Sequence, residues 1–241
     1  MRLQQVAGCV IVLLACFLGA CQLDAGRMVQ AAATLYQGET ISNADVATLG
    51  ERVVAQHDSE SRIAGAGNAY AKRLAHITKG LERESGLNLN FKVYLKDEIN
   101  AFATPDGSIR VYSGLMDIMT DDELFFVIGH EIGHVKHGHS LGAMRKAYRA
   151  AAVVQALGAT HSSAASVADS DVAKVAQSFM QAQFSQAHES ESDVFGVKLL
   201  KKYNRPKEAA VSGLRKLGNA GGGAFSSHPN PQKRADAVAR M

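Results

Sequence analysis

The segment His130-Glu131-Ile132-Gly133-His134 determines the predicted fold and chemistry of this chain. Histidines four residues apart on a helix share one face, about one turn from each other. Two imidazoles in that arrangement can bind one zinc ion. Glu131 then lies beside the metal, where its carboxylate can take a proton from a water whose pKa zinc lowers to about 7. The pattern predicts a helical zinc hydrolase with ligands His130 and His134 and general base Glu131. On the five residues alone, a helix with two accidental surface histidines is the alternative.

The flanking residues predict a well-defined, buried helix for this motif. Thr120 to Glu123 has the form of a capping box, and apolar residues follow at helical spacing from Leu124 to Val135. Gly138 is a plausible end of the helix. A buried helix gives the metal a dry wall, which strengthens the electrostatic effects that catalysis needs.

A third metal ligand is expected from an acidic segment further along the chain. Glu189 and Asp193 are four residues apart, so a helix presents both carboxylates on one face. We assign Glu189 to the metal and Asp193 to a hydrogen bond with the outer nitrogen of His130. Glu191 is the competing ligand, but it lies about 200° around the helix from Glu189. A solvated acidic helix face is the alternative interpretation.

Two further histidines extend the cluster without completing a different zinc motif. The metzincin pattern requires glycine three residues and histidine six residues after the second histidine, where this chain has His137 and Ser140. We therefore expect His137 and His139 to face solvent or to cap a helix.

Three segments in order carry a resemblance to a known family: H-E-I-G-H at 130–134, E-S-E-S-D at 189–193 and H-P-N-P-Q-K-R at 228–234. They resemble the signatures of the gluzincin metallopeptidases that include HtpX and the CAAX prenyl endopeptidases. Residues 100–103 and 109–116 resemble the periplasmic lipoprotein branch of that family. The similarity runs from about residue 40 to the C-terminus, apart from a weak stretch near 150–180. It implies one Zn²⁺ per chain and peptide bonds as substrate.

The 228–234 segment offers two further candidates for the active site. His228 or Arg234 could stabilise the oxyanion of the reaction. Alternatively, His228 could occupy the open position of the zinc and silence the resting enzyme. We favour the inhibitory ligand, because Gly221 to Gly223 supply the hinge that a switch requires.

The fold class expected is α+β: a mostly helical zincin domain with a small antiparallel sheet beside the motif helix. Residues 89–95 alternate as a half-buried strand, and the turn at 104–107 predicts a hairpin of 100–103 with 109–112. An edge strand can pair with an extended peptide, although a purely structural hairpin is equally compatible with the sequence. The expected substrate-binding strand comprises Asn100, Ala101, Phe102 and Ala103.

Other helices are expected around this core. Ser61 to Glu84 has the pattern of one amphipathic helix that ends at Gly86. Residues 147–183 predict two helices around a loop, a possible cover over the cleft, and Arg205-Pro206 starts another helix.

The N-terminus predicts export and lipidation. Arg2 precedes an apolar or glycine run from Val6 to Ala20, which is too short to span a membrane but suits a signal peptide. Residues 18–21 resemble a lipobox, which implies cleavage before Cys21 and lipidation of that residue, and the following Gln22 implies the outer membrane, facing the periplasm. We therefore divide the chain into a signal (1–20), a tether (21–42) and a metallopeptidase domain (43–241).

Together these features predict a zinc endopeptidase of the bacterial envelope that degrades misfolded or unassembled proteins. An outer-membrane assembly machinery is a further possible partner. The net charge of +3, without a basic block, gives no indication of nucleic acid binding. The alternatives are a holdase or assembly factor with a structural zinc and, less favoured, a metallohydrolase that acts on another substrate.

Overall fold

A computed structural model describes residues 41–157, 169–220 and 227–241. Cys21, the predicted signal and nearly all of the predicted tether lie outside the described residues, as do Gly221 to Gly223. None of the described helices is long and apolar enough to cross a membrane. The helices and strands, in order, are α3 (Asn43–Glu60), α4 (Ala69–Ile77), η1 (Glu84–Gly86), β1 (Asn90–Tyr94), β2 (Ala101–Ala103), β3 (Ser108–Tyr112), α5 (Ser113–Ile118), α6 (Asp121–Lys136), α7 (His139–Leu157), α8 (Asp169–Met180), α9 (Gln186–Lys202), α10 (Glu208–Asn219) and α11 (Pro231–Ala239).

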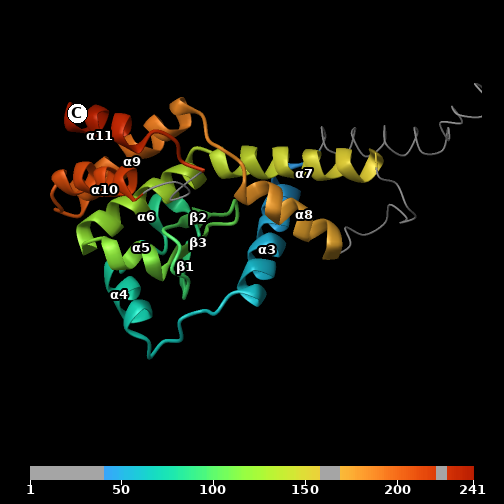
Figure 1. Ribbon diagram of the computed structural model, residues 1–241, viewed down its shortest axis with the longest axis horizontal. Coiled ribbons are helices and arrows are strands. Elements are labelled where there is room, and N and C mark those ends of the chain that lie inside the picture. The colour runs from blue at the N-terminus through green and yellow to red at the C-terminus, as the bar shows by residue number, and fades with distance from the viewer. Residues whose placement is uncertain (1–40, 158–168, 221–226) are drawn as a thin grey trace, which may run out of the picture.

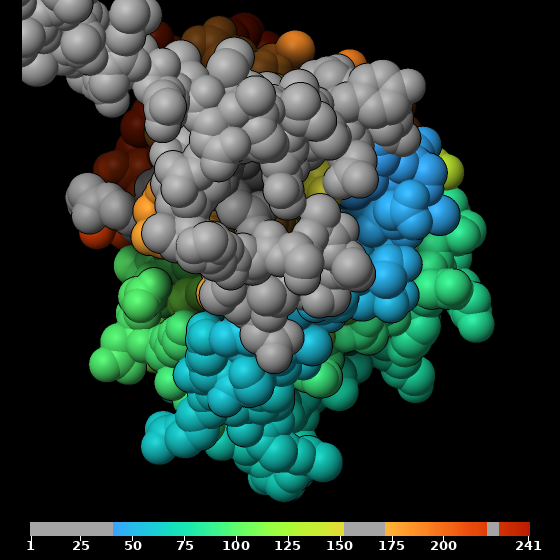
Figure 2. Space-filling model, turned by 90° about the vertical axis from the view of Figure 1, so that its right-hand side faces the viewer, coloured from blue at the N-terminus to red at the C-terminus, as the bar shows by residue number. Residues whose placement is uncertain are grey.

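The elements form an α+β arrangement, as the sequence predicts. The described sheet has three strands in the order β1-β3-β2. Helices α3, α7 and α8 gather at one end of the molecule, and α9, α10 and α11 gather at the other (Figure 1). Figure 2 shows α3, in blue, at the surface of the first group.

The sheet confirms the predicted hairpin and corrects the predicted topology. β2 pairs antiparallel with β3, with Ala101 opposite Val111 and Ala103 opposite Ile109. β1, however, pairs parallel with β3 from Asn90 onward, so the sheet is mixed and not purely antiparallel. The reason is that β3 returns from the hairpin between its two predecessors, which leaves β2 as an outer strand.

Each face of the sheet belongs to a different hydrophobic cluster, because side chains alternate along a strand. Ala101, Ile109 and Val111 join the cluster that contains α6, α9 and α10. Tyr94 and Phe102 point the other way, toward α3, α7 and α8. The sheet therefore lies between α6 and α3, and α6 is buried almost along its whole length.

The predicted helix from Ser61 to Glu84 is wrong in extent, since only α4 (Ala69–Ile77) is an α-helix. The segment before α4 is extended along the free edge of β1, where the Ala64 N–H donates to the Val93 carbonyl at 2.9 Å. Asn68 then caps α4 by accepting a hydrogen bond from the Tyr70 N–H. Pairing with the sheet thus overrides the helical pattern in this segment.

The helix that carries the motif is confirmed in detail. Thr120 is the N-cap of α6 and accepts from the Glu123 N–H, while the Glu123 carboxylate accepts from the Thr120 N–H. The helix ends at Lys136, with His137 as C-cap, and Gly138 follows at φ 74°. The positive φ turns the chain sharply, so that α7 begins at once with His139.

α6 and α9 approach each other closely through glycines. A Cβ at Gly133 would lie 3.0 Å from Ser192 Cα, and one at Gly129 would lie 3.2 Å from Gly196 Cα. These distances are shorter than the optimum of about 3.5–4.0 Å for two carbon atoms. The absence of side chains therefore permits the helix separation that brings the histidines of α6 next to the carboxylates of α9.

The remaining predicted helices are present. Two helices, α7 and α8, occupy most of the alanine-rich region from 147 to 183, and their connection lies outside the described residues. α10 follows Arg205-Pro206 as expected, but it begins at Glu208 with Lys207 as N-cap, so Pro206 precedes the helix.

Candidate metal centre

Four buried side chains each bring one ligand atom to a common point: His130, His134, Glu189 and His228. They come from α6, from the first turn of α9 and from the segment before α11, and their ligand atoms all lie within 4.8 Å of one another. His130 Nε2 is 3.0 Å from His134 Nε2. Glu189 Oε1 lies 3.4 Å from His134 Nε2. His228 Nδ1 is 3.1 Å from both His130 Nε2 and Glu189 Oε1.

These distances fit a tetrahedral zinc ion. Bonds of about 2.0–2.1 Å at tetrahedral angles place neighbouring donor atoms roughly 3.3 Å apart. The measured separations scatter around that value. Hydrogen bonds alone would not explain the cluster, because one ring nitrogen of His130 faces a nitrogen of both His134 and His228. A shared cation satisfies all of these lone pairs at once.

Burial favours the neutral imidazoles that metal binding requires. It lowers the pKa of His134 to about 2, and burial and the Arg234 charge lower the pKa of His130. Burial by itself would raise the pKa of Glu189, but the charge of His228 and hydrogen bonds from His134 and His228 bring it well below the ordinary value. The carboxylate is therefore ionised. The site combines the neutral imidazoles of His130 and His134 with one anionic oxygen donor, Glu189.

The outer nitrogen of His130 has the partner predicted from the sequence. His130 Nδ1 lies 2.9 Å from Asp193 Oδ1, one turn after Glu189 on α9. Arg234 holds this carboxylate with two hydrogen bonds, from Nε at 2.8 Å and from Nη2 at 2.6 Å. The third guanidinium nitrogen lies against Glu189. Arg234, suggested from the sequence for the oxyanion, is thus engaged with two carboxylates on α9.

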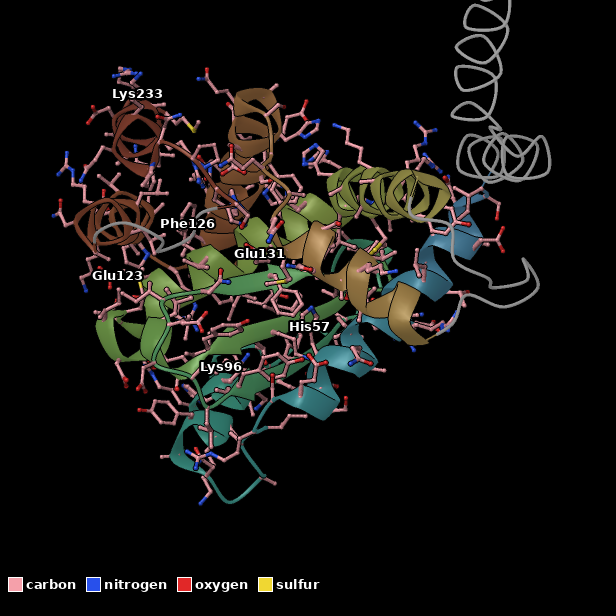
Figure 3. All side chains as sticks on the ribbon, turned by 45° about the vertical axis from the view of Figure 1, so that its right-hand side comes forward. His57, Lys96, Glu123, Phe126, Glu131 and Lys233 are labelled. Carbon is pink, nitrogen blue, oxygen red and sulfur yellow. The ribbon has the colours of Figure 1, made fainter. Side chains whose placement is uncertain are left out.

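Glu131 lies on α6 where the helix passes over the sheet, five residues after Phe126 (Figure 3). Burial raises its pKa to about 7. Its Oε1 has no hydrogen-bond partner among the described residues and lies 3.4 Å from His228 Nε2. A carboxylate with these properties is suited to accept and return a proton near neutral pH.

His228 contacts both the cluster of metal ligands and the general base Glu131. Nδ1 faces the ligand cluster, and Nε2 faces Glu131. Burial would lower the pKa of His228, but the carboxylates of Glu131 and Glu189 raise it. Its segment is tied to the loop before α9, since the Phe184 N–H donates to the Ser227 carbonyl at 3.1 Å.

Phe184 is a residue of the site that the sequence did not indicate. Its ring centroid lies 3.9 Å from that of His134 and 5.2 Å from that of His228. In the sequence, Phe184 differs from its neighbours only as an isolated aromatic residue in the polar stretch from Gln181 to Ser185. The ring shields these two imidazoles on one side.

The prediction that His137 and His139 face solvent or cap a helix is confirmed only for His137. His137 is exposed and caps α6, as expected. His139 is buried, with an exposed fraction of 6%, so the prediction that it faces solvent is wrong. The turn at Gly138 directs it back against the outer side of His134, with the two Nδ1 atoms 3.2 Å apart.

The predicted substrate strand lies beside the centre. β2 is an outer strand of the described sheet and packs against α6. The carbonyl of Asn100 accepts from the Tyr112 N–H, and the Thr104 N–H donates to the Ser108 carbonyl. Because bonding alternates along a strand, the backbone groups of Ala101 and Ala103 point away from β3. They are positioned to pair with an added strand.

Comparison with known proteins is consistent with this centre. The sequence matches the family described as peptidase family M48 over residues 68–241. It is 36% identical to Metalloprotease YcaL of Escherichia coli K12, over 90% of this chain and 87% of that protein. It is 35% identical to Metalloprotease LoiP of the same organism, over 90% of this chain and 89% of LoiP. A putative β-barrel assembly-enhancing protease of Vibrio cholerae is 28% identical over 56% of this chain and 29% of its own length.

Proposed function

This chain belongs to peptidase family M48 and is a zinc metalloendopeptidase, and from that premise we propose that it degrades misfolded or unassembled proteins of the bacterial envelope. The observation that carries the peptidase chemistry is the convergence of His130, His134 and Glu189 beside a buried Glu131. We further propose one zinc ion per chain, held by these three side chains.

The residues around the ion divide the catalytic work. Bound zinc polarises the scissile carbonyl and lowers the pKa of a water molecule. Glu131 accepts a proton from the attacking water and later donates it to the leaving nitrogen. Asp193 orients the ring of His130, and Arg234 fixes Asp193 while it neutralises part of the negative charge on Glu189.

The proposed resting state has His228 as a fourth ligand. Two observations support it: Nδ1 lies at ligand distances from its neighbours, and Nε2 faces the general base. A catalytic zinc needs an open position for water or substrate. His228 therefore has to leave before turnover, and its departure also frees Glu131. The alternative role, a donor to the oxyanion, requires His228 to remain close to the reacting carbonyl.

Substrate selection follows from the proposed pairing with β2. An extended chain can bond to the backbone of Ala101 and Ala103, and main-chain bonds recognise extended peptides with modest sequence preference. Unfolded or unassembled proteins expose such segments. The envelope location rests on the N-terminal sequence, where lipidated Cys21 would anchor the protein to the outer membrane on its periplasmic side.

The experiment that tests the proposal compares casein digestion by the wild-type protein and by Glu131→Gln, each with and without a chelator. We expect the wild type to be inhibited by the chelator, and Glu131→Gln to lose a factor of about 10² to 10⁴ in turnover while it retains zinc. Glu208→Gln, an exposed carboxylate on α10, is the matched control and should match the wild type.

Undiminished turnover of zinc-loaded Glu131→Gln would contradict the mechanism. The envelope role is tested separately, by complementation of a deletion strain under envelope stress. If Glu131→Gln restores growth as well as the wild type does, the proposed degradative role is wrong and a holdase or assembly role replaces it.

A further inference from the structure

His139 makes two contacts that together form a continuous chain from the metal centre to the surface. Its Nδ1 lies 3.2 Å from Nδ1 of His134, on the side of that ring away from Glu189. Its Nε2 lies 2.9 Å from Oε2 of Glu191, whose side chain is 57% exposed. Ser192 Oγ is a more distant neighbour of the same Nδ1, at 3.4 Å.

The donors and acceptors along this chain can be assigned from chemistry. His134 Nε2 faces the ligand cluster and presents its lone pair there, so the proton of the neutral ring is on Nδ1. That N–H then donates to Nδ1 of His139, which places the proton of the second ring on Nε2. The Nε2–H donates to Glu191, and an ionised carboxylate only accepts. Every link therefore has one donor and one acceptor.

The ring of His139 is also held in place from its faces. The imidazole of His188 stacks on it at a centroid distance of 4.1 Å and an angle of 16°. His137 is stacked at 5.6 Å. A ring that is buried, stacked and bonded at both nitrogens has one orientation available, so it can impose an orientation on its neighbour.

We infer that His139, anchored by Glu191, is the positioning residue that orients His134 as a metal ligand. It does for His134 what Asp193, anchored by Arg234, does for His130. Outer partners of ligand histidines fix the tautomer and the ring orientation, and their removal typically costs about 10- to 100-fold in metal affinity. The inference rests on the proposed role of His134 as a ligand. It also gives Glu191 a function, although Glu191 is not itself a ligand.

The decisive measurement is zinc affinity, determined by competition with a chromophoric chelator at constant pH. We expect His139→Ala to bind zinc about 10- to 100-fold more weakly, because the His134 N–H loses its acceptor. His139→Asn should recover most of that loss, since its amide oxygen can take the place of Nδ1. His76→Ala, which removes an exposed imidazole on α4 that has no contact with His139, is the control and should bind zinc like the wild type.

Failure of this inference is distinguishable from failure of the proposed metal site. If His134→Ala loses zinc while His139→Ala binds it as tightly as the wild type, the site is correct and the positioning role is wrong. If His134→Ala retains wild-type affinity, the metal site itself is wrongly assigned.

A second readout does not depend on the stability of any variant. Ring ¹⁵N chemical shifts of the zinc-loaded wild-type protein report the tautomer of each histidine. We expect protonated Nδ1 on His134 and protonated Nε2 on His139. A protonated Nδ1 on His139 would overturn the inference, because that nitrogen could not accept the bond from His134.

Melting of the metal-free His139 variants shows whether any loss of affinity comes from unfolding.

Discussion

Replacing Gly133 by alanine tests whether the close approach of α6 and α9 builds the metal centre. The added Cβ would lie 3.0 Å from Ser192 Cα and 3.2 Å from Phe195 Cβ. One of these neighbours is backbone, so the contact cannot be relieved by a side-chain rotation. The helices must move apart by roughly half an ångström to reach the optimum carbon–carbon distance of about 3.5 Å.

Two opposing effects set the magnitude. Alanine in place of glycine favours a helix by about 1 kcal/mol, whereas overpacking a core costs about 1–3 kcal/mol. Gly142 on α7 provides the control, since a Cβ there would meet nothing within 4 Å. Gly142→Ala should therefore show the helix gain alone. The free energy of unfolding of Gly133→Ala should be about 1–3 kcal/mol lower than that of Gly142→Ala.

The assay is thermal unfolding of both variants without metal, followed by zinc titration of each. For a domain of this size, 1 kcal/mol shifts the melting temperature by about 2–4 °C, so the two variants should differ by roughly 2–12 °C. Gly133→Ala should also bind zinc more weakly, because α6 carries His134 and α9 carries Glu189. Equal melting temperatures and equal zinc affinities in the two variants would refute the reasoning.

Three further outcomes are expected. Glu189→Ala should lose zinc on dialysis, whereas Glu191→Ala should keep close to one zinc per chain with a modestly lower affinity. Equal zinc losses in the two variants, measured by metal analysis, would contradict the assignment of Glu189 as a ligand. His228→Ala should raise peptidase activity at unchanged zinc content and melting temperature, whereas a fall of about 10² to 10³ in turnover would instead indicate an oxyanion donor. For Asp58, burial would raise the pKa, but hydrogen bonds led by that of buried Arg110 lower it to about 2. This pair should therefore stabilise the fold above about pH 4 and lose that effect as the pH falls toward 2. Asp58→Asn should cost about 2 kcal/mol at pH 7, and the difference from the wild type in urea unfolding should disappear over the same acid range.

The parts of the centre that depend on helical spacing could be predicted from the sequence. The capping box at Thr120 and Glu123 sets the start of α6, and the spacing of four places His130 and His134 on one face. The same spacing places Glu189 and Asp193 on one face of α9. These features are local, so sequence separation alone determines their geometry.

Features that depend on long-range packing were missed or wrong. Nothing near Ser61 indicates that its segment will be drawn to the edge of β1 instead of continuing as a helix. The parallel pairing of β1 with β3 depends on where the hairpin packs. His139 looked like one more polar residue in a histidine-rich run. Its role depends on the turn at Gly138 and on the distant Glu191, which only the folded chain brings together.

The guanidinium of Arg234 has a consequence for when this protease can become active. It contacts His130 and Asp193. Arg234 lies on α11, 104 residues after His130 in the sequence. A chain that is still being synthesised or exported carries the zinc motif long before it carries this support. We therefore expect a half-made molecule to have little proteolytic activity. In the proposed role, in which the enzyme cuts unfolded chains, this order would protect other copies of the same protein from cleavage before folding is complete.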